Sequence, residues 1–197
     1  HSYFNQTDWS NGQFFQKSLN LEEANPGGEL QIKQINGKYA SMSQEWLESN
    51  TFDLGVSANF YRIKWNPSSQ PLQVGLDSLK FQIATNNDNS TWNFVGPDGN
   101  PNTYYTDPDS VISAGHNNNR YLRYKIYLIT QDEDFTPKLQ DIEIEFSSSC
   151  ISSGQSFFSG LDVGTYDISI HKNGYQDFTS PVTIGSGWQE IRAILIP

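Results

Sequence analysis

The feature that most constrains the fold is an alternation of apolar and polar residues between Tyr121 and Leu128. The apolar side consists of Leu122, Tyr124, Ile126 and Leu128, and the other side of Tyr121, Arg123, Lys125 and Tyr127. A period of two residues is typical of a β-strand with one buried face. The segment that begins at Trp92 and leads into this strand is rich in Gly, Pro, Asp and Asn, which favour turns. We therefore expect a strand that presents a long decorated loop, an arrangement common in binding modules.

The rest of the chain repeats this pattern in shorter stretches. Residues 79–83 and 139–146 alternate in the same way, and Asn36-Gly37 is a typical hairpin turn. One helical turn, capped by Ser43, is expected over 43–48, and no longer helix is indicated. Many short strands separated by turn residues predict an all-β protein. We expect a jelly-roll β-sandwich over residues 1–146 and a second, small β-sandwich over 147–197, divided by a Ser-rich break at 147–150.

Composition and charge exclude several classes of partner. The 197 residues carry 22 acidic and 12 basic side chains, for a formal net charge of -10. Nucleic acids and anionic membranes require clustered Lys and Arg, so we expect neither as a partner. No apolar stretch approaches the ~18 residues of a membrane span, and we expect no membrane insertion by this chain. Hydrophobic residues make up 36% and aromatic residues 14%, so aromatic side chains must supply much of the core.

The single cysteine, Cys150, excludes a disulfide within the chain. In a secreted protein such a cysteine indicates a partner chain, a missing segment or a free thiol. Abundant Asn, Ser, Thr, Gly and Tyr with few Lys are typical of exported bacterial proteins, and we predict an extracellular or cell-surface location. The sequence begins with no signal peptide, so we expect a mature protein or an excised soluble part.

Several short sequences between Thr51 and Phe146 are informative together. They are Phe52-Asp53-x-Gly55, Ile63-x-Trp65, Phe81-Gln82-Ile83-Ala84, Gly96-Pro97-Asp98-Gly99, Thr103-Tyr104-Tyr105, Arg120-Tyr121-Leu122-Arg123-Tyr124 and Thr136-Pro137-x-Leu139. This set resembles sandwich domains that recur in large bacterial surface and secreted proteins. Such domains are similar to galactose-binding-type jelly rolls, and some accompany pilin-like helices or secreted enzymes. The resemblance implies a presentation or binding role and transfers no catalytic residue.

A second set of markers lies near the C-terminus. It consists of Gly154, Phe158, Leu161, Gly164-Thr165-Tyr166, Ile168, Ile170 and Gly174-Tyr175. This pattern resembles the second half of a prealbumin-like fold, as in carboxypeptidase regulatory-like domains and the B-type repeats of Gram-positive adhesins. The resemblance implies an Ig/prealbumin-like β-sandwich for residues 147–197. The first strands of that fold are not evident before Gly154, so either this unit docks on the first domain or part of it is missing.

Acidic residues in the loops form one candidate site. Asp107 and Asp109 flank Pro108, and Asp98 and Asp88 lie on neighbouring loops. These carboxylates offer the oxygen ligands that Ca²⁺ takes, although the regular spacing of an EF-hand is absent. The simpler interpretation is that each is a solvated, turn-forming Asp. We predict no cofactor other than calcium, with that alternative left open.

Aromatic residues around the same loop form a second candidate site. Its aromatic members are Trp92, Tyr104, Tyr105 and Tyr121, and its polar members are Asn86, Asn87, His116 and Arg120. Ligand sites combine apolar faces with a few polar groups, so stacking on sugar rings is one interpretation. The other is that Trp92 and some of the tyrosines belong to the core. We expect the loop 96–119 and the turn 86–89 to form the functional surface, because an irregular connection of this length is generally functional or disordered.

Indications of catalysis are few. Asp141, Glu143 and Glu145 alternate along one expected strand, where neighbours at i and i+2 lie ~7 Å apart, between the separations of retaining and inverting glycosidases. An exposed strand face explains the same pattern. The three histidines show no zinc-ligand spacing, and the sequence contains no nucleophile motif or phosphate loop. We predict that the protein is not an enzyme.

These observations predict a non-enzymatic extracellular module for adhesion, glycan binding or assembly of a surface structure. Its partner is expected to be a glycan or another cell-surface protein, within a larger surface assembly. Two alternatives stay open. One is an accessory or catalytic domain of a carbohydrate-active enzyme, and the other is the structural head domain of a pilin-like subunit or surface fibre.

Overall fold

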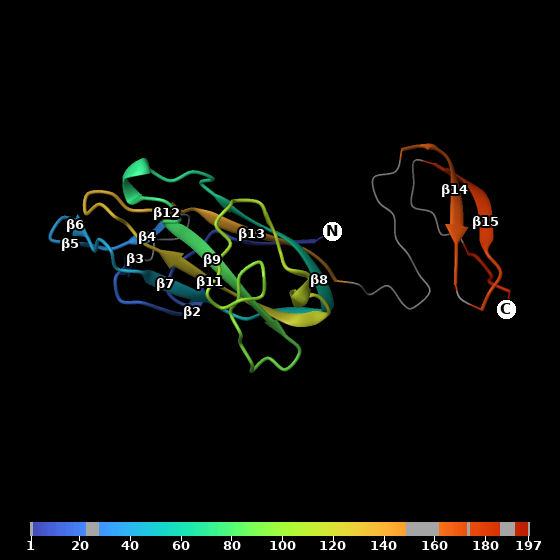
Figure 1. Cartoon of the computed structure of the whole chain (residues 1–197), viewed down its shortest axis with the longest axis horizontal. Coiled ribbons are helices and arrows are strands. Elements are labelled where there is room, and N and C mark those ends of the chain that lie inside the picture. The colour runs from blue at the N-terminus through green and yellow to red at the C-terminus, as the bar shows by residue number, and fades with distance from the viewer. Residues whose placement is uncertain (1, 23–27, 149–161, 173, 186–191, 197) are drawn as a thin grey trace. The chain divides into compact units, whose positions relative to one another are not determined.

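The computed structural model describes residues 2–22, 28–148, 162–172, 174–185 and 192–196. They belong to two compact units, His1–Cys150 and Ile151–Pro197, each of which is described by itself (Figure 1). Their regular structure is antiparallel β-strand apart from two short 3-10 helices, η1 (Leu72–Val74) and η2 (Ala114–His116). The predicted all-β fold is confirmed. In the described part of the chain, no helix is long and apolar enough to cross a membrane.

The first unit contains one large sheet, one small sheet and a hairpin. Its described strands are β1 (Ser2–Gln6), β2 (Phe14–Lys17), β3 (Leu21–Glu22), β4 (Leu30–Ile32), β5 (Gln34–Ile35), β6 (Lys38–Tyr39), β7 (Glu45–Ser49), β8 (Phe52–Asn66), β9 (Leu79–Asn86), β10 (Ser110–Val111), β11 (Asn119–Leu128), β12 (Lys138–Leu139) and β13 (Asp141–Ser148). The large sheet has the order β1-β13-β8-β11-β7-β2, with β10 paired to β8 and β9 to β11. The small sheet has the order β12-β4-β3.

The long strand β8 belongs to both layers of a β-sandwich. Its first residues pair with β11, whereas residues 58–66 pair with β13. One layer contains β1, β13, the second part of β8 and β10, and the other contains β2, β7, β11 and β9. The inner faces meet in the core, where the ring centroids of Trp65 and Phe81 are 4.5 Å apart. A strand that changes layers closes one end of the sandwich (Figure 1).

A bulge at Gly55 makes the bend in β8. Residues 54–57 lie opposite Arg120 alone, and Gly55 has a φ of 78°, which only glycine adopts without strain. The carboxylate of Asp53 accepts a hydrogen bond from the Gly55 N–H at 2.8 Å and two from the Arg120 guanidinium at 2.6 and 2.8 Å. The bond from Arg120 is the main reason that the pKa of Asp53 is lowered to about 2. The bend is therefore fixed by a charged clamp.

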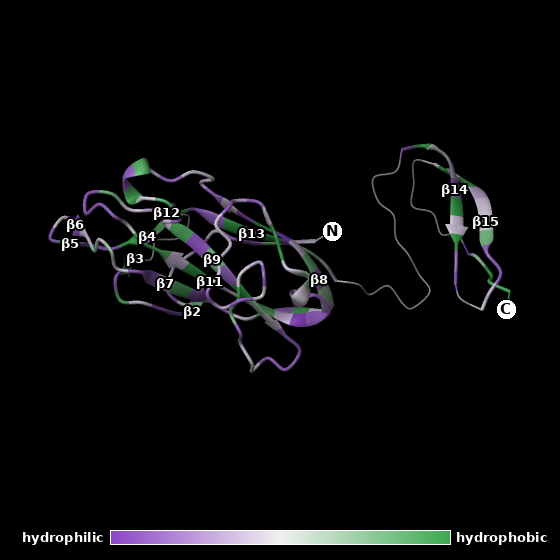
Figure 2. Ribbon diagram, in the orientation of Figure 1, coloured by the Kyte–Doolittle hydropathy of each residue, from purple (hydrophilic) through white to green (hydrophobic). Residues whose placement is uncertain are grey.

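The alternation between Tyr121 and Leu128 forms β11, and its apolar side faces the core as predicted. Leu122, Tyr124, Ile126 and Leu128 are at most 2% exposed. Along β9 the same alternation is visible as bands of hydropathy (Figure 2). The Tyr124 hydroxyl donates to the side-chain carbonyl of Gln6, so the most deeply buried tyrosine leaves no unpaired polar group. Each apolar side chain buried in this way stabilises the fold by about 2 kcal/mol.

The segment 43–48 differs from its prediction. Instead of a helical turn, Glu45–Ser49 forms β7, which is paired with β11 on one side and β2 on the other. Pairing on both edges satisfies the backbone of β7, and this tertiary contribution outweighs a weak local preference. The turn at Asn36-Gly37 is confirmed, because it joins β5 to β6 with φ angles of 54° and 80°.

In the second unit, β14 (Gly164–Ile170) and β15 (Phe178–Ile184) form an antiparallel hairpin, with Gly164 opposite Ile184. The side chains of Tyr166, Ile168 and Ile170 are less exposed than those between them, as their alternation predicts. Cys150 and the markers between 154 and 161 lie outside the described residues. The prealbumin-like pattern and the pairing of Cys150 therefore stay predictions. In the first unit β13 continues to Ser148, past the boundary expected at 146.

Candidate functional site

Aromatic and cationic side chains gather on the outer face of the layer that contains β7, β11 and β9. Strand pairing places two rows of side chains across these strands, Trp46, Tyr127 and Lys80 in one row and Glu48, Lys125 and Gln82 in the next. Further aromatic side chains reach this face from β2 and from the loop that follows β9. The outer sheet face is the set Phe15, Trp46, Lys80, Trp92, Phe94, Tyr104, Arg123, Lys125 and Tyr127.

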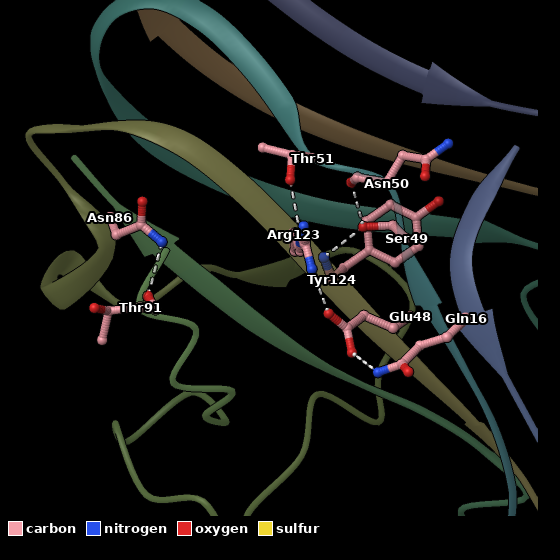
Figure 3. A network of polar contacts seen from close by, with 9 residues as sticks. All are labelled: Gln16, Glu48, Ser49, Asn50, Thr51, Asn86, Thr91, Arg123 and Tyr124. Atoms are coloured by element: carbon pink, nitrogen blue, oxygen red, sulfur yellow. Dashed lines mark hydrogen bonds and ion pairs between the residues drawn. The ribbon is translucent and has the colours of Figure 1, made fainter. Parts of the chain in front are cut away.

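Arg123 is held on this face by an ion pair that is almost buried (Figure 3). Its Nη1 lies 2.8 Å from Glu48 Oε1, and its Nε donates to Thr51 Oγ1 at 2.8 Å. The exposed fractions of the Arg123 and Glu48 side chains are 12% and 7%. The guanidinium also lies over the rings of Phe15 and Trp92, at 4.2 and 4.4 Å from their centroids. One cation thus holds two aromatic rings from distant parts of the chain.

Lys125 lies opposite Glu48 in register but does not pair with it. The carboxylate of Glu48 is occupied by Arg123 and, through Oε2, by the Gln16 side chain at 2.9 Å (Figure 3). The Lys125 Nζ instead lies 4.3 Å from the ring centroid of Trp46. Among the described residues, Lys125 has no carboxylate partner.

Lys80 repeats this arrangement on β9. Its Nζ lies 4.0 Å from the ring centroid of Tyr104, and Tyr104 packs edge-on against Tyr127 with centroids 5.2 Å apart. The Tyr127 hydroxyl donates to Gln82 Oε1 at 2.8 Å. Burial raises the pKa of Tyr127 to about 12, so this hydroxyl remains a donor at neutral pH.

Gln82 also fixes the loop that carries Tyr104. Its amide nitrogen donates to the carbonyls of Pro101 and Thr103 at 2.7 and 2.9 Å, while its oxygen accepts from Tyr127. The amide nitrogen of the nearly buried Gln82 donates twice and its oxygen accepts once, so moving the loop would leave buried polar groups unpaired at a cost in stability. The predicted irregular loop is therefore an ordered cover on this side of β9.

Tyr105, adjacent to Tyr104, points the other way. It forms an isolated bridge with Phe81, is 1% exposed, and accepts a hydrogen bond from the Ser113 N–H at 3.2 Å. Successive residues of an extended chain face opposite sides, so Tyr105 enters the core while Tyr104 lies on the outer sheet face. The structure therefore places Tyr105, expected to stack on a ligand, in the interior.

The turn after β9 positions the Trp92 ring next to the Arg123 guanidinium. The Asn86 amide donates to the Thr91 carbonyl at 2.7 Å (Figure 3). Asp88 accepts from the Thr91 N–H at 3.0 Å and from its hydroxyl at 2.7 Å. These bonds close the turn directly before Trp92, whose ring then covers Arg123. Asn86 and Asp88 thus have structural roles in the turn.

His116 is also internal, with an exposed fraction of 5%. Its Nδ1 lies 3.0 Å from Thr85 Oγ1, and its buried Nε2 has no hydrogen-bond partner. Burial lowers the pKa of His116 to about 4, so the ring is neutral at neutral pH. Asn119 donates to Thr85 Oγ1 and to the His116 carbonyl, at 3.0 and 3.1 Å. His116 therefore supports the loop 96–119 from the side of the core.

Arg120 and Tyr121 lie at the start of β11. Arg120 is committed to Asp53 at the bend of β8, and its guanidinium carbon lies 5.1 Å from the Tyr121 ring centroid. Tyr121 is on the same side of β11 as Arg123, opposite Asn86. Of the six residues predicted to bind a ligand, Trp92 and Tyr104 belong to the outer sheet face, and Tyr121 lies on the same side of β11. Tyr105 and His116 are buried, and Arg120 belongs to the bend.

The four aspartates proposed for calcium lie on three turns, with Asp107 and Asp109 on the same one. Hydrogen bonds within their own turns lower the pKa of Asp88 and of Asp98. Asp109 pairs with Arg62 at 3.0 Å, and Asp107 is exposed. Within the residues that the structure describes, no three His, Cys, Asp or Glu side chains gather into a metal site. Calcium binding stays a prediction, which melting curves with Ca²⁺ and with chelator would test.

The acidic residues of β13 make cross-strand contacts with β8. Asp141 accepts from the Asn66 amide at 2.9 Å, and Glu143 lies 3.4 Å from the Lys64 Nζ. Glu145 is opposite Arg62 in the same ladder. These contacts are those of a partly exposed strand face.

A cavity of about 470 Å³ lies elsewhere, beside η1. Trp65, Pro67 and Pro71 are among its lining residues, and Leu72 and Leu76 at its edge are 96% and 91% exposed. None of the residues predicted to bind a ligand or metal lines it.

The sequence prediction of the ligand site missed seven members of the outer sheet face, which are Phe15, Trp46, Lys80, Phe94, Arg123, Lys125 and Tyr127. The available signal was the polar side of β11, where Arg123 and Lys125 alternate with tyrosines. Comparison with models of known protein families gives no match, and comparison with curated proteins gives no significant one. The functional argument therefore rests on the geometry of the outer sheet face.

Proposed function

We propose that this chain is a non-enzymatic carbohydrate-binding module of an extracellular or cell-surface protein, and that the outer sheet face holds the sugar. One observation carries the proposal: aromatic side chains from separate segments meet on a sheet face turned away from the core. Phe15 comes from β2, Trp46 from β7 and Trp92 from the loop after β9. Phe15 is 56% exposed, and the other two are partly exposed.

Physical chemistry favours a sugar as the partner of such a face. Apolar rings at the surface forgo the stabilisation that burial provides, and a group of them is characteristic of binding surfaces. Sugars present apolar C–H faces and polar edges, which match rings interspersed with a few polar groups. Arg123, Lys125 and Lys80 hold the rings in place before any ligand arrives. Preorganisation of this kind reduces the entropy lost on binding.

Glycan-array binding and affinity electrophoresis with the isolated chain test the proposal. Trp92→Ala and Tyr104→Ala should each weaken binding at least about tenfold, because aromatic anchors dominate such interfaces. The matched control is Tyr3→Ala, which removes a 57% exposed ring that lies near Lys64 on the opposite layer. No glycan binding at all, or equal effects of the three substitutions, would refute the proposal.

The two alternatives make different predictions in the same assay. An accessory domain of a carbohydrate-active enzyme would use the same face and differ only in the catalytic domain joined to it. The head of a pilin-like subunit or surface fibre would bind no glycan and would instead depend on neighbouring subunits. The resemblances to galactose-binding-type jelly rolls and to prealbumin-like domains support a surface module in general and favour none of these three roles.

A further inference from the structure

Two lysines of the outer sheet face differ from most cations of the first unit. A carboxylate oxygen lies within 3.4 Å of each of Lys38, Arg62, Lys64, Arg120, Arg123 and Lys138. Lys80 and Lys125 have no such partner within the described residues, although the chain carries 22 acidic and 12 basic side chains. A shortage of acidic residues is therefore not the reason that these two lysines are unpaired.

The two lysines are diagonal neighbours on adjacent strands. Lys80 lies opposite Tyr127, and Lys125 is two positions before Tyr127 on β11, which places their Cα atoms ~7 Å apart. The Lys80 ammonium lies over Tyr104 and the Lys125 ammonium over Trp46, at 4.0 and 4.3 Å from the ring centroids. Like charges on neighbouring positions of one sheet face repel each other. An anion bound between them would remove this repulsion.

Glu48, the carboxylate opposite Lys125, does not neutralise this pair. Its Oε1 lies 2.8 Å from Arg123 and its Oε2 accepts from Gln16 at 2.9 Å. The negative charge of Glu48 is thus balanced by Arg123, and the region around Lys80 and Lys125 keeps a local positive charge. Two neighbouring lysines on a chain of net charge -10 match a single carboxylate group at the site.

We propose that the outer sheet face binds a carboxylate-bearing sugar of the uronate type, with the carboxylate between Lys80 and Lys125 and the sugar ring against Tyr104 and Trp46. This inference rests on the proposed function, because it specifies which class of glycan that face takes. Two ammonium groups suit the two oxygens of one carboxylate. A nucleic acid would need a row of phosphate contacts, which two lysines do not supply.

The test compares acidic polysaccharides with their neutral counterparts. Polygalacturonate, alginate and hyaluronate are each titrated beside the carboxyl-reduced polymer, in which CH₂OH replaces the carboxylate. The acidic form of at least one should bind at least about tenfold more tightly than its reduced form, and more weakly as salt rises. Lys80→Gln and Lys125→Gln should each remove most of this preference. Lys33→Gln, at an exposed lysine outside the outer sheet face, is the matched control.

The outcomes separate this inference from the proposed function. Equal binding of acidic and reduced polymers, or an unchanged preference in Lys80→Gln and Lys125→Gln, would overturn the uronate inference and leave glycan binding intact. Binding only to neutral glycans on the array, with that binding lost in Trp92→Ala, would also overturn the uronate inference and leave glycan binding intact. No binding to any acidic, reduced or neutral glycan would overturn both. Melting curves of the lysine variants that match the parent exclude misfolding as the cause of a loss.

Discussion

At the scale of single residues, the ion pair between Glu48 and Arg123 holds the rings of the outer sheet face to the sheet beneath. Both side chains are nearly buried, with exposed fractions of 7% and 12%. Removing one partner of a buried ion pair leaves an uncompensated charge, at a typical cost of about 3 kcal/mol. We predict that Glu48→Gln lowers the free energy of unfolding by that amount, as measured by urea titration.

The matched control for this substitution is Glu143→Gln. It breaks the ion pair with Lys64, in which the side chains are 33% and 39% exposed. Exposed ion pairs contribute about 0–1 kcal/mol, so this variant should unfold at nearly the same urea concentration as the parent. Equal losses of stability in the two variants would contradict the role assigned to burial.

His116 gives a prediction about pH. Burial lowers its pKa from 6.5 to about 4, so between these values the unfolded chain binds more protons than the folded protein. Stability should therefore fall as pH falls from 6.5 to about 4, by about 3 kcal/mol in all. We predict that His116→Gln flattens the dependence of melting temperature on pH in this window. An unaltered slope in His116→Gln would assign the pH dependence to another group.

At the scale of elements, the turn 96–103 depends on a glycine that has no room for a side chain. A Cβ on Gly96 would overlap the backbone and hydroxyl of Thr103, which itself binds Asp98. Overpacking such a site costs about 1–3 kcal/mol. We predict that Gly96→Ala lowers the free energy of unfolding by that amount and moves Tyr104, as seen in the NMR signals of its ring. Gly115→Ala should change neither the free energy of unfolding nor the NMR signals of Tyr104, because a Cβ at Gly115 would make only an ordinary contact at 3.6 Å.

Strands with one buried face could be predicted from sequence, and strands specified by their neighbours could not. In β11 the alternation of buried and partly exposed residues from Tyr121 to Ile126 follows directly from the position of the core. In β7, Glu45 and Glu48 are nearly buried although both are acidic, because side-chain partners from other segments satisfy them. The local sequence of residues 43–48 carries no information about those partners, and by itself it predicts a helical turn.

The candidate site was predictable in part for a similar reason. The loop composition identified Trp92 and Tyr104, but the opposite placement of Tyr104 and Tyr105 depends on a bridge to Phe81 that no sequence pattern specifies. Trp46 reaches the same face from a strand more than forty residues earlier in the chain, through the register of β7 against β11. Sequence patterns gave the residue types of the site, whereas strand register determined which of them meet.

At the scale of the whole molecule, the described hydrophobic core belongs to the first unit. The residues of its main cluster run from Trp9 to Ile144, and all lie before the break at 147–150. In the described part of the second unit, the strand residues of β14 and β15 are partly or fully exposed. Because the main core cluster contains no described residue of the second unit, the stability of the first unit should not depend on the second.

We predict that a chain shortened to residues 1–148 keeps the main melting transition within about 2 °C, which for this size corresponds to less than about 1 kcal/mol. It should also bind the same glycans as the full chain, because every residue of the outer sheet face lies between Phe15 and Tyr127. The control removes residues 1–6 instead, which deletes β1, its pairing with β13 and the bond from Tyr124 to Gln6. That variant should melt at a clearly lower temperature, since a buried hydroxyl loses its partner and Phe4 leaves the core. A large loss of stability in 1–148, measured by calorimetry, would show that the C-terminal unit contributes to the first unit after all.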